Sequence, residues 1–313
     1  MLGLSTGQLM SLMTYTMQIL MSLMMLSMVL VMITIARASA ERIDELLREE
    51  SDIRNNENPI YEVADGEIRF ENVRFCYSKE ANTFCLKEIN LTIKSGETVG
   101  IIGGTGSAKT TLVQLIPRLY DVYSGKVIVG GVDVRDYDLE SLRDQVAFVL
   151  QKNILFSGTI KENLRWGKRD AGDEELIHAS KIAQADNFIQ SLPEKYDTYI
   201  EQGGANVSGG QKQRLCLARA LLKKPKILIL DDSTSAVDTK TEAMLRRALR
   251  NELPETTKLI ISQRVASVED ADRIIVMDDG RIVDIGTHEQ LLQSSRIYRE
   301  VYQSQVEGGS RIA

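Results

Sequence analysis

Residues 99–111 read VGIIGGTGSAKTT, and this stretch decides the fold. Its first four residues form a short apolar run of the kind that is buried as a strand of a parallel sheet. A glycine-rich turn follows at once and directs backbone N–H groups, together with the positive end of a helix, at a phosphate group. The stretch therefore predicts a strand, a helix and, between them, a phosphate-binding loop with the nucleotide-binding residues Gly103, Gly104, Thr105, Gly106, Ser107, Ala108, Lys109, Thr110 and Thr111.

Ala108 departs from the phosphate-loop pattern G-x-x-x-x-G-K-[ST], which has its second glycine at this position. If the backbone there has a positive φ, alanine adds strain of about 1–3 kcal/mol; if φ is negative, the methyl group is nearly harmless. The sequence leaves both alternatives open. A dinucleotide-binding G-x-G-x-x-G pattern fails, because Lys109 stands at its last position. We expect Lys109 to reach the outer phosphates and the hydroxyl of Thr110 to ligate Mg²⁺.

Two further patterns support phosphate chemistry. The apolar run 227–230 ends in Asp231 and Asp232, and Asp231 could hold Mg²⁺ directly or through water. Taken alone, this acidic pair could also cap a helix or be a solvated strand end. A second glycine-rich turn that opens a helix consists of Val207, Ser208, Gly209, Gly210 and Gln211. Its structural alternative is a helix N-terminus with Ser208 as the cap.

The remainder of this region alternates strand-like runs with helix-like segments. Strand-like runs cover residues 67–77, 86–94, 98–103, 146–150, 227–230 and 259–261. Continuous apolar runs of this length, each followed by polar or glycine-rich residues, indicate buried parallel strands. The predicted fold class is therefore α/β.

The amino-terminal part has a different character, because residues 1–36 contain no Asp, Glu, Lys, Arg or His. A membrane-spanning helix needs about 20 apolar residues, and residues 9–36 exceed that length. Arg37 and Arg42 follow, which places the carboxyl end in the cytosol and the chain in the cell membrane. The sequence Ala38-Ser39-Ala40 resembles the cleavage site of a secretory signal peptide. Against this interpretation, no basic segment precedes the apolar run, and the run is longer than the hydrophobic region of a signal peptide. A buried helix of a soluble protein is the other alternative.

Polar residues recur on one face of this predicted helix at steps of three or four, namely Gln8, Ser11, Tyr15, Gln18 and Ser22. They could pack against other helices or line a substrate path. In either case the chain needs partner helices in the lipid bilayer. We place a polar helical extension and a linker after the span, so that the two domains are residues 1–58 and 59–313.

Composition excludes several classes of protein. The 313 residues include 38 Lys+Arg and 44 Asp+Glu, a formal charge of −6, which argues against nucleic acid as a partner. The three cysteines form no C-x-x-C pair, and there are two histidines, so a disulfide framework or a Cys/His metal site is not expected.

With these motifs, the chain resembles the ATP-binding-cassette (ABC) family, and closely resembles the ATPase end of a multidrug-type exporter. The resemblance covers essentially the whole chain. It implies an ABC nucleotide-binding domain of the P-loop NTPase fold, with a RecA-like parallel core, an antiparallel β subdomain and a helical signature subdomain. One transmembrane α-helix, similar to the last of the six in an exporter, precedes it. It also implies ATP and Mg²⁺ as ligands, with Thr110, Gln151 and Asp231 at the metal.

The resemblance assigns roles to further residues. Tyr77 matches the aromatic residue that stacks on adenine, and Gln151 matches the glutamine that senses Mg²⁺ and contacts the membrane domain. Residues 235–238 match the loop that crosses between partner subunits. The segment from Val207 to Gln211 matches the signature, which binds ATP held by the partner. Residues 280–289 resemble the closing hairpin and helix of the family.

Besides Ala108, three positions depart from the family pattern. The catalytic glutamate is Asp232, which is one methylene shorter, and a displacement of about 1 Å can lower a rate by roughly 10²-fold. The switch histidine is Gln263, whose amide cannot become cationic near neutral pH. In the segment before the signature, Gln202 replaces a glutamate. Because Asp232 and Gln263 both act on hydrolysis, the resemblance implies a hydrolysis-impaired subunit that pairs with a second half-transporter in a heterodimer.

Two other functions stay open: a homodimeric ATPase with two slow sites, and a regulatory cassette that binds ATP without transport. An exporter subunit of this type has six spans, so we expect the chain to be an amino-terminally truncated part of a multi-pass protein. We expect its nucleotide-binding domain to be cytoplasmic. The exported substrate, expected to be hydrophobic or drug-like, cannot be identified from the sequence.

Overall fold

The computed structural model describes residues 5–78, 83–232 and 239–310. The chain forms two compact units, which comprise residues 1–52 and 53–313. Each unit is described by itself below.

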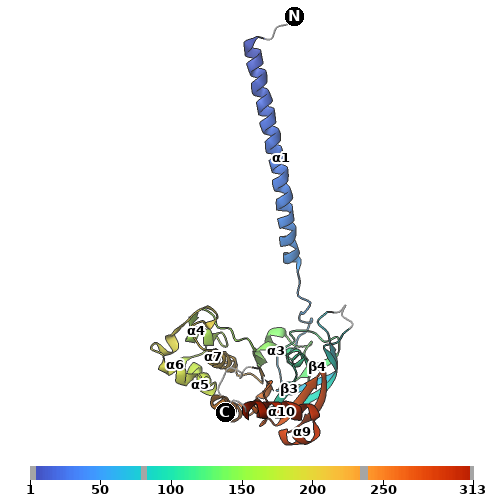
Figure 1. Ribbon diagram of the computed structural model, residues 1–313, viewed down its shortest axis with the longest axis vertical. Coiled ribbons are helices and arrows are strands. Elements are labelled where there is room, and N and C mark those ends of the chain that lie inside the picture. Colours follow the sequence, from blue (N-terminus) through green and yellow to red (C-terminus); the bar gives the residue numbers. More distant parts are fainter. Residues whose placement is uncertain (1–4, 79–82, 233–238, 311–313) are drawn as a thin grey trace. The chain divides into compact units, whose positions relative to one another are not determined.

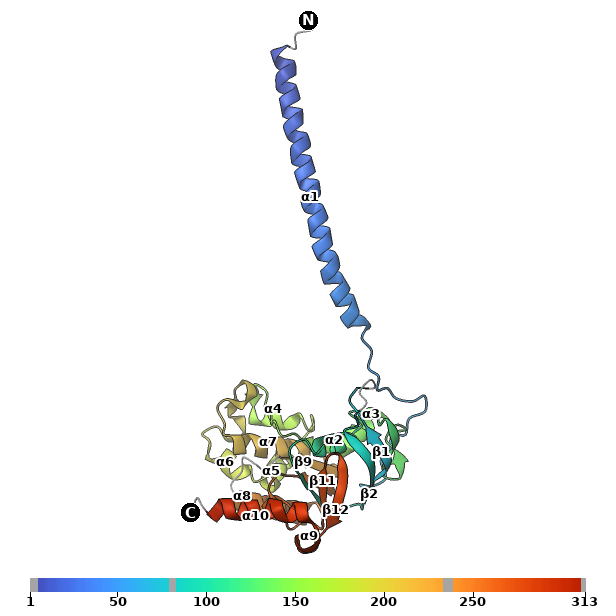
Figure 2. The ribbon, with the colours of Figure 1, turned by 45° about the vertical axis from the view of Figure 1, so that its right-hand side comes forward.

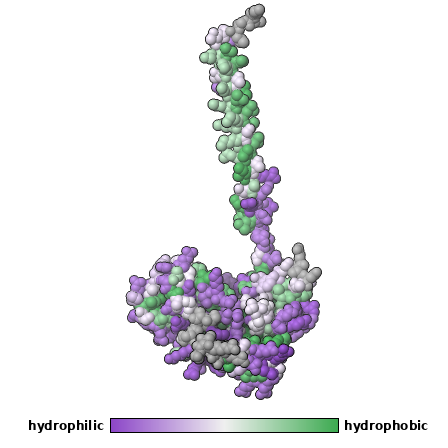
Figure 3. Space-filling model, in the orientation of Figure 1, coloured by the Kyte–Doolittle hydropathy of each residue, from purple (hydrophilic) through white to green (hydrophobic). Residues whose placement is uncertain are grey.

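The amino-terminal unit is the helix α1 (Thr6–Arg48), the only helix in the described part of the chain that is long and apolar enough to cross a membrane. Its apolar stretch gives way to a polar end (Figure 3), where Arg37 pairs with Glu41 and Arg48 with Asp44. In the polar stripe, the hydroxyls of Ser11 and Ser22 donate hydrogen bonds to carbonyls one turn earlier. These bonds within the helix reduce the cost of placing the stripe in lipid.

The second unit is built around a six-stranded sheet in the order β12-β11-β3-β10-β9-β6. Its strands pair in parallel except for β12, which is antiparallel to β11. Every residue of β3, β9 and β10 is buried, as expected for strands that are covered on both faces. The strands are β3 (Thr98–Gly103), β6 (Val146–Val149), β9 (Ile227–Asp231), β10 (Thr257–Ile261), β11 (Arg273–Asp278) and β12 (Arg281–Gly286).

A second sheet is antiparallel, in the order β2-β1-β4-β5. It consists of β1 (Ile68–Phe75), β2 (Leu86–Ile93), β4 (Ser124–Val129) and β5 (Val132–Asp133). The two-residue strands β7 (Gly158–Thr159) and β8 (Tyr199–Ile200) form a separate pair. The α/β fold class, the parallel core and the antiparallel β subdomain are therefore confirmed.

Some of the helices pack on the parallel sheet, and the others form a separate group (Figures 1 and 2). In both views α4 to α7 gather on the side away from β1 and β2. The helices are α2 (Lys109–Gln114), α3 (Leu139–Gln145), α4 (Ile160–Arg165), α5 (Asp173–Ile182), α6 (Asp186–Ser191), α7 (Gly209–Leu221), α8 (Thr239–Glu252), α9 (His288–Ser294) and α10 (Arg296–Ser310).

Two hydrophobic clusters lie on opposite faces of the sheet. Along β9, Leu228 and Leu230 belong to the cluster that packs against the helical group, whereas Ile227 and Ile229 belong to the cluster shared with the antiparallel sheet. Successive side chains of a strand point to opposite faces, which produces this division.

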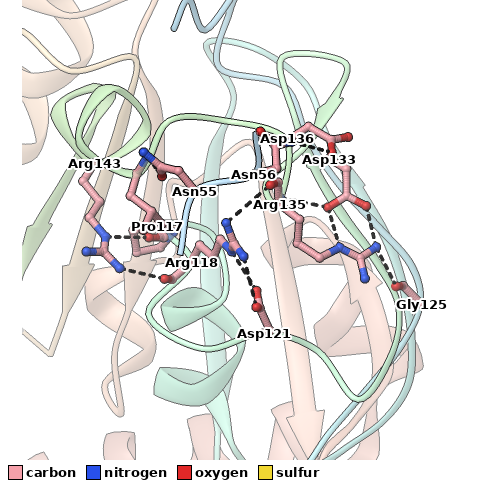
Figure 4. Close-up of polar contacts among 11 residues, drawn as sticks. Asn55, Asn56, Pro117, Arg118, Asp121, Gly125, Asp133, Arg135, Asp136 and Arg143 are labelled. Atoms are coloured by element: carbon pink, nitrogen blue, oxygen red, sulfur yellow. Dashed lines mark hydrogen bonds and ion pairs between the residues drawn. The ribbon is translucent and has the colours of Figure 1, made fainter. Parts of the chain in front are cut away.

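Within the second unit, its first residues are hydrogen-bonded to the segment that leads into α3. The side-chain oxygen of Asn55 accepts a hydrogen bond from the N–H of Leu139 at 2.9 Å, and its amide donates to Asp138, the cap of α3. Asn56 donates to Asp136 at 3.4 Å. Nearby, the guanidinium of Arg118 is held by Asp121 in a two-pronged ion pair (Figure 4).

Candidate functional site

The predicted phosphate-binding, metal-binding and catalytic residues follow the carboxyl ends of four neighbouring parallel strands, β3, β10, β9 and β6. Ile261 at the end of β10 pairs in register with Asp231 of β9 and with Ile101 of β3, whose last residue, Gly103, opens the phosphate loop. In open α/β sheets ligands bind at this edge. The topology therefore brings the phosphate loop, the acidic pair and the turn after β10 together.

Lys109 turns back into the phosphate loop. Its ammonium donates hydrogen bonds to the carbonyls of Gly103 and Gly104, each at 2.8 Å, and contacts the hydroxyl of Ser107 at 3.2 Å. Burial lowers the pKa of Lys109, and the carboxylates of Asp231 and Asp232 oppose that shift. A buried cation held only by neutral oxygens is well placed to pair with an anion that enters the loop.

The structure decides between the two alternatives for Ala108. Its φ is +69° and its ψ is +25°, in the left-handed region. Gly106, two residues earlier, also has a positive φ of +82°. Alanine at this position therefore carries the backbone strain that a glycine would avoid.

The polar residues at the strand ends form two hydrogen-bonded pairs. The hydroxyl of Thr110 donates to the Asp231 carboxylate at 2.8 Å, and the amide of Gln151 donates to the Asp232 carboxylate at 3.3 Å. Asp231 is 5% exposed, and burial raises its pKa, with the Thr110 hydrogen bond acting in the opposite direction. Asp232 has a positive φ of +45°.

The polar oxygen atoms at these strand ends suit Mg²⁺, which takes part of its ligands from water and substrate, better than they suit a metal ion that is bound by protein side chains alone. The described residues contain no group of three or more His, Cys, Asp and Glu that could hold a metal ion. A hydroxyl, a carboxylate and an amide oxygen, from Thr110, Asp231 and Gln151, are hard ligands of the kind that Mg²⁺ combines with water and substrate phosphates.

Tyr77 belongs to an aromatic cluster at the other end of the phosphate loop. Its ring meets those of Phe75 and Tyr120 edge to face, with centroids 4.9 and 5.1 Å apart. Its hydroxyl lies 2.9 Å from the hydroxyl of Thr111. The side chain of Tyr77 is nevertheless 55% exposed, so it offers a free aromatic surface rather than filling the core.

A cavity of about 390 Å³ joins Tyr77 to the phosphate loop. Sequence reasoning missed part of its wall, which comes from Phe84 and Cys85 before β2 and from the turn between β11 and β12. At that turn, Asp279 pairs with Lys87 at 2.6 Å. Gly280 lies so close to Cys85 that a Cβ atom at this position would collide with the Cys85 carbonyl oxygen. The wall residues are Tyr77, Phe84, Cys85, Gly106, Ala108, Lys109, Thr110, Thr111, Asp279 and Gly280.

The residues of the predicted signature are not in this cavity wall. They form the exposed amino end of α7, where the Ser208 hydroxyl accepts a hydrogen bond from the N–H of Gln211 and caps the helix. The capping alternative is thus present, and it leaves Gly209 at the exposed tip. Residues 235–238, the predicted crossing loop, lie outside the described residues.

Gln263 follows β10 with an exposed side chain. Its carbonyl accepts a hydrogen bond at 2.7 Å from Gln305 of α10, a residue that no sequence pattern singled out. His288, the first residue of α9, is half-buried, and its Nδ1 lies 2.7 Å from the hydroxyl of Tyr298.

A second cavity, of about 450 Å³, extends from β6 to α7 beside the segment after Gln151. Its wall is largely apolar and includes Phe156 and Trp166, whose rings are 4.8 Å apart and both exposed to solvent. The guanidinium of Arg219 lies over the Phe156 ring. An exposed apolar surface of this kind is typical of a protein contact.

The fold and the phosphate loop define a P-loop nucleotide-binding protein. Residues 86–235 match the ABC transporter family, to which this chain belongs. The chain is 43% identical over 299 residues to the ABC transporter ATP-binding protein YfiB of Bacillus subtilis, and 44% identical over 237 residues to YgaD of the same organism, named for multidrug export.

A solved bacterial Atm1-family ABC exporter with ATP bound is 32% identical, with a TM-score of 0.82 over 96% of this chain. The chain spans about half the length of these proteins: 52% of YfiB, 41% of YgaD and 53% of the solved exporter. These similarities confirm the family predicted from the sequence motifs.

Proposed function

We propose that this chain is the ATP-binding subunit of an ABC exporter and that it works with a second half-transporter in the cell membrane. The cavity between Tyr77 and the phosphate loop would hold ATP, with adenine on the free face of Tyr77 and the phosphates at Lys109. Mg²⁺ would be held by Thr110, Asp231 and Gln151. Helix α1 would cross the bilayer and leave the nucleotide-binding unit in the cytoplasm. Similarity to relatives named for multidrug export supports a hydrophobic or drug-like substrate.

The separation of the signature from the cavity supports a composite site. Ser208, Gly209 and Gly210 lie at an exposed helix start and do not line the chain's own cavity. Backbone N–H groups at such a start favour an anion. In the proposed pair of subunits, each signature would complete the site on the other chain, facing the terminal phosphate of ATP there.

One observation carries the proposed asymmetry: Asp232, at the position of the catalytic base, lies against Gln151. In the nucleotide-free chain its carboxylate interacts with an amide on its own side of the site. A short carboxylate reaches an attacking water poorly. Gln263, at the end of the neighbouring strand, cannot supply a positive charge to the developing phosphate anion. The site would therefore bind ATP and hydrolyse it slowly.

The apolar cavity beside Gln151 supports coupling to a membrane domain. Its exposed aromatic residues, Phe156 and Trp166, would receive a cytosolic segment of that domain. Four residues, 152–155, separate Phe156 from Gln151. A shift of the bound segment would therefore be passed along the backbone to Gln151, and from Gln151 to Asp232.

The test is to purify the full chain with its candidate half-transporter partner and to measure phosphate release. Replacing the partner's catalytic glutamate is expected to abolish turnover, whereas Asp232→Asn should change it less than about twofold. Lys109→Met serves as the binding control and should remove ATP from this chain's site. If Asp232→Asn abolishes turnover and the change in the partner does not, the proposed asymmetry is wrong. Slow ATP turnover by this chain alone, with no second kind of subunit present, would favour the homodimeric ATPase.

A further inference from the structure

The side chain of Gln305, on α10, bridges the backbone on both sides of Arg264. Its amide nitrogen donates to the carbonyl of Gln263 at 2.7 Å, and its amide oxygen accepts from the N–H of Val265 at 2.9 Å. A primary amide can donate a hydrogen bond from its nitrogen and accept one at its oxygen at the same time, as it does here. The bridge spans 42 residues of sequence between α10 and the turn after β10.

Helix α10 is itself firmly held. Tyr298 is fully buried, and its hydroxyl lies 2.7 Å from Nδ1 of His288 in α9. Ile297 and Val301 pack against the buried cluster on the helical side of the sheet. Gln305 therefore extends from a fixed support, and its two hydrogen bonds restrict the turn rather than follow it.

The turn that Gln305 holds lies next to the phosphate site. The N–H of Ser262 donates to the carbonyl of Ile101 in β3, and the N–H of Asp232 donates to the carbonyl of Ile261 in β10. The backbone after β10 is thus fixed between the phosphate-loop strand and the acidic strand. The next residue, Gln263, is the first whose carbonyl is held from α10 instead.

We propose that Gln305 is a positioning residue, which holds the turn at residues 263–265 in the conformation that meets the terminal phosphate of ATP. The inference rests on the proposed function, because it requires ATP at the phosphate loop. ADP lacks the terminal phosphate and does not reach this turn. Loss of the bridge should therefore weaken ATP binding selectively.

The expected size of the effect follows from the two lost hydrogen bonds. If the turn then adopts its binding conformation only a fraction of the time, the dissociation constant for ATP rises by the inverse of that fraction. Two hydrogen bonds, one part-buried and one exposed, correspond to a change of about tenfold. The dissociation constant for ADP should stay within about twofold of the wild-type value.

The experiment measures the binding of Mg·ATP and Mg·ADP to the full chain in detergent, by calorimetry, for the wild type, Gln305→Ala and Gln305→Glu. The glutamate variant keeps an acceptor for Val265 but sets a carboxylate oxygen against the carbonyl of Gln263, so it should show the same selective loss. Gln303→Ala is the matched control, since Gln303 is an exposed glutamine about 200° around the same helix.

A lower affinity for ATP with unchanged ADP binding, together with faster amide hydrogen exchange at residues 262–268, supports the assignment. Equal losses for the two nucleotides indicate a merely structural role and overturn it. Unchanged affinity for both nucleotides overturns it as well. A wild-type chain that binds neither nucleotide contradicts the proposed function itself, and this inference then falls with it.

Discussion

Replacing Ala108 by glycine should stabilise the protein, although glycine usually does the opposite. The left-handed backbone of Ala108 costs a residue with a Cβ atom about 1–2 kcal/mol. Glycine removes that strain but adds about 0.5–1 kcal/mol of conformational entropy to the unfolded chain. The net expected gain is therefore about 0–1.5 kcal/mol, and its midpoint corresponds to a rise in Tm of about 2 °C for a unit of this size.

The assay is thermal unfolding of the full chain, followed by circular dichroism in the presence and absence of Mg·ATP. Ala248→Gly is the matched control, because Ala248 is also half-buried but lies within the helix α8. There glycine should lower the free energy of unfolding by about 0.5–1 kcal/mol. A loss of stability in Ala108→Gly equal to that in the control would refute the assignment of strain to the phosphate loop.

Three further changes test other parts of the structure. Asp231→Asn should stabilise the nucleotide-free chain at neutral pH while abolishing Mg²⁺-dependent nucleotide binding. Burial raises the pKa of Asp231, so the folded chain keeps the carboxyl proton to a higher pH than the unfolded chain does. The wild type should therefore lose stability as the pH rises from the unfolded-state pKa of Asp231 through its folded-state pKa. An unchanged pH profile of unfolding in the variant would contradict this. Lys258, which donates to the carbonyls of Leu253 and Thr256, has its pKa lowered by burial to about 8. The unfolded chain then binds more protons between pH 8 and 10.5, so wild-type stability should rise over this range, by at most about 3 kcal/mol relative to Lys258→Met. Parallel curves for the two proteins would show that Lys258 does not titrate there. Asn55→Ala should lower the free energy of unfolding by about 1–2 kcal/mol in urea, because two hydrogen bonds to the start of α3 are lost. Asn56→Ala, which removes a single 3.4 Å contact, should have a smaller effect, and the reverse order would argue against a stabilising role for the Asn55 hydrogen bonds.

The sequence predicted the parallel core well because burial on both faces leaves a clear signal. The run 98–103 coincides with β3, and the runs 146–150 and 227–230 each differ from their strands by one residue at one end. The family resemblance correctly indicated the antiparallel sheet. These features depend on local composition, which a single sequence displays directly.

The contacts that shape the site were not predictable in the same way. The φ of Ala108 depends on how the loop closes over the phosphate position, and the sequence pattern is compatible with either sign. Phe84 and Gly280 meet in one cavity wall because β2 and β12 lie close together, although nearly 200 residues separate them. Gln305 is an exposed glutamine with no local signal, and its role is visible only once α10 is placed beside the turn after β10.

The central claim, that this site binds ATP but hydrolyses it slowly, is tested most directly by restoring the two altered groups. Phosphate release per bound ATP should be slow when the wild-type full chain is paired with a half-transporter whose own catalytic glutamate has been replaced, so that only this chain's site can turn over. It should rise at least about tenfold in Asp232→Glu combined with Gln263→His, because a longer base reaches the water and an imidazole can carry charge. Rapid release by the wild type that Asp232→Asn abolishes, with no gain in the double variant, would contradict the account.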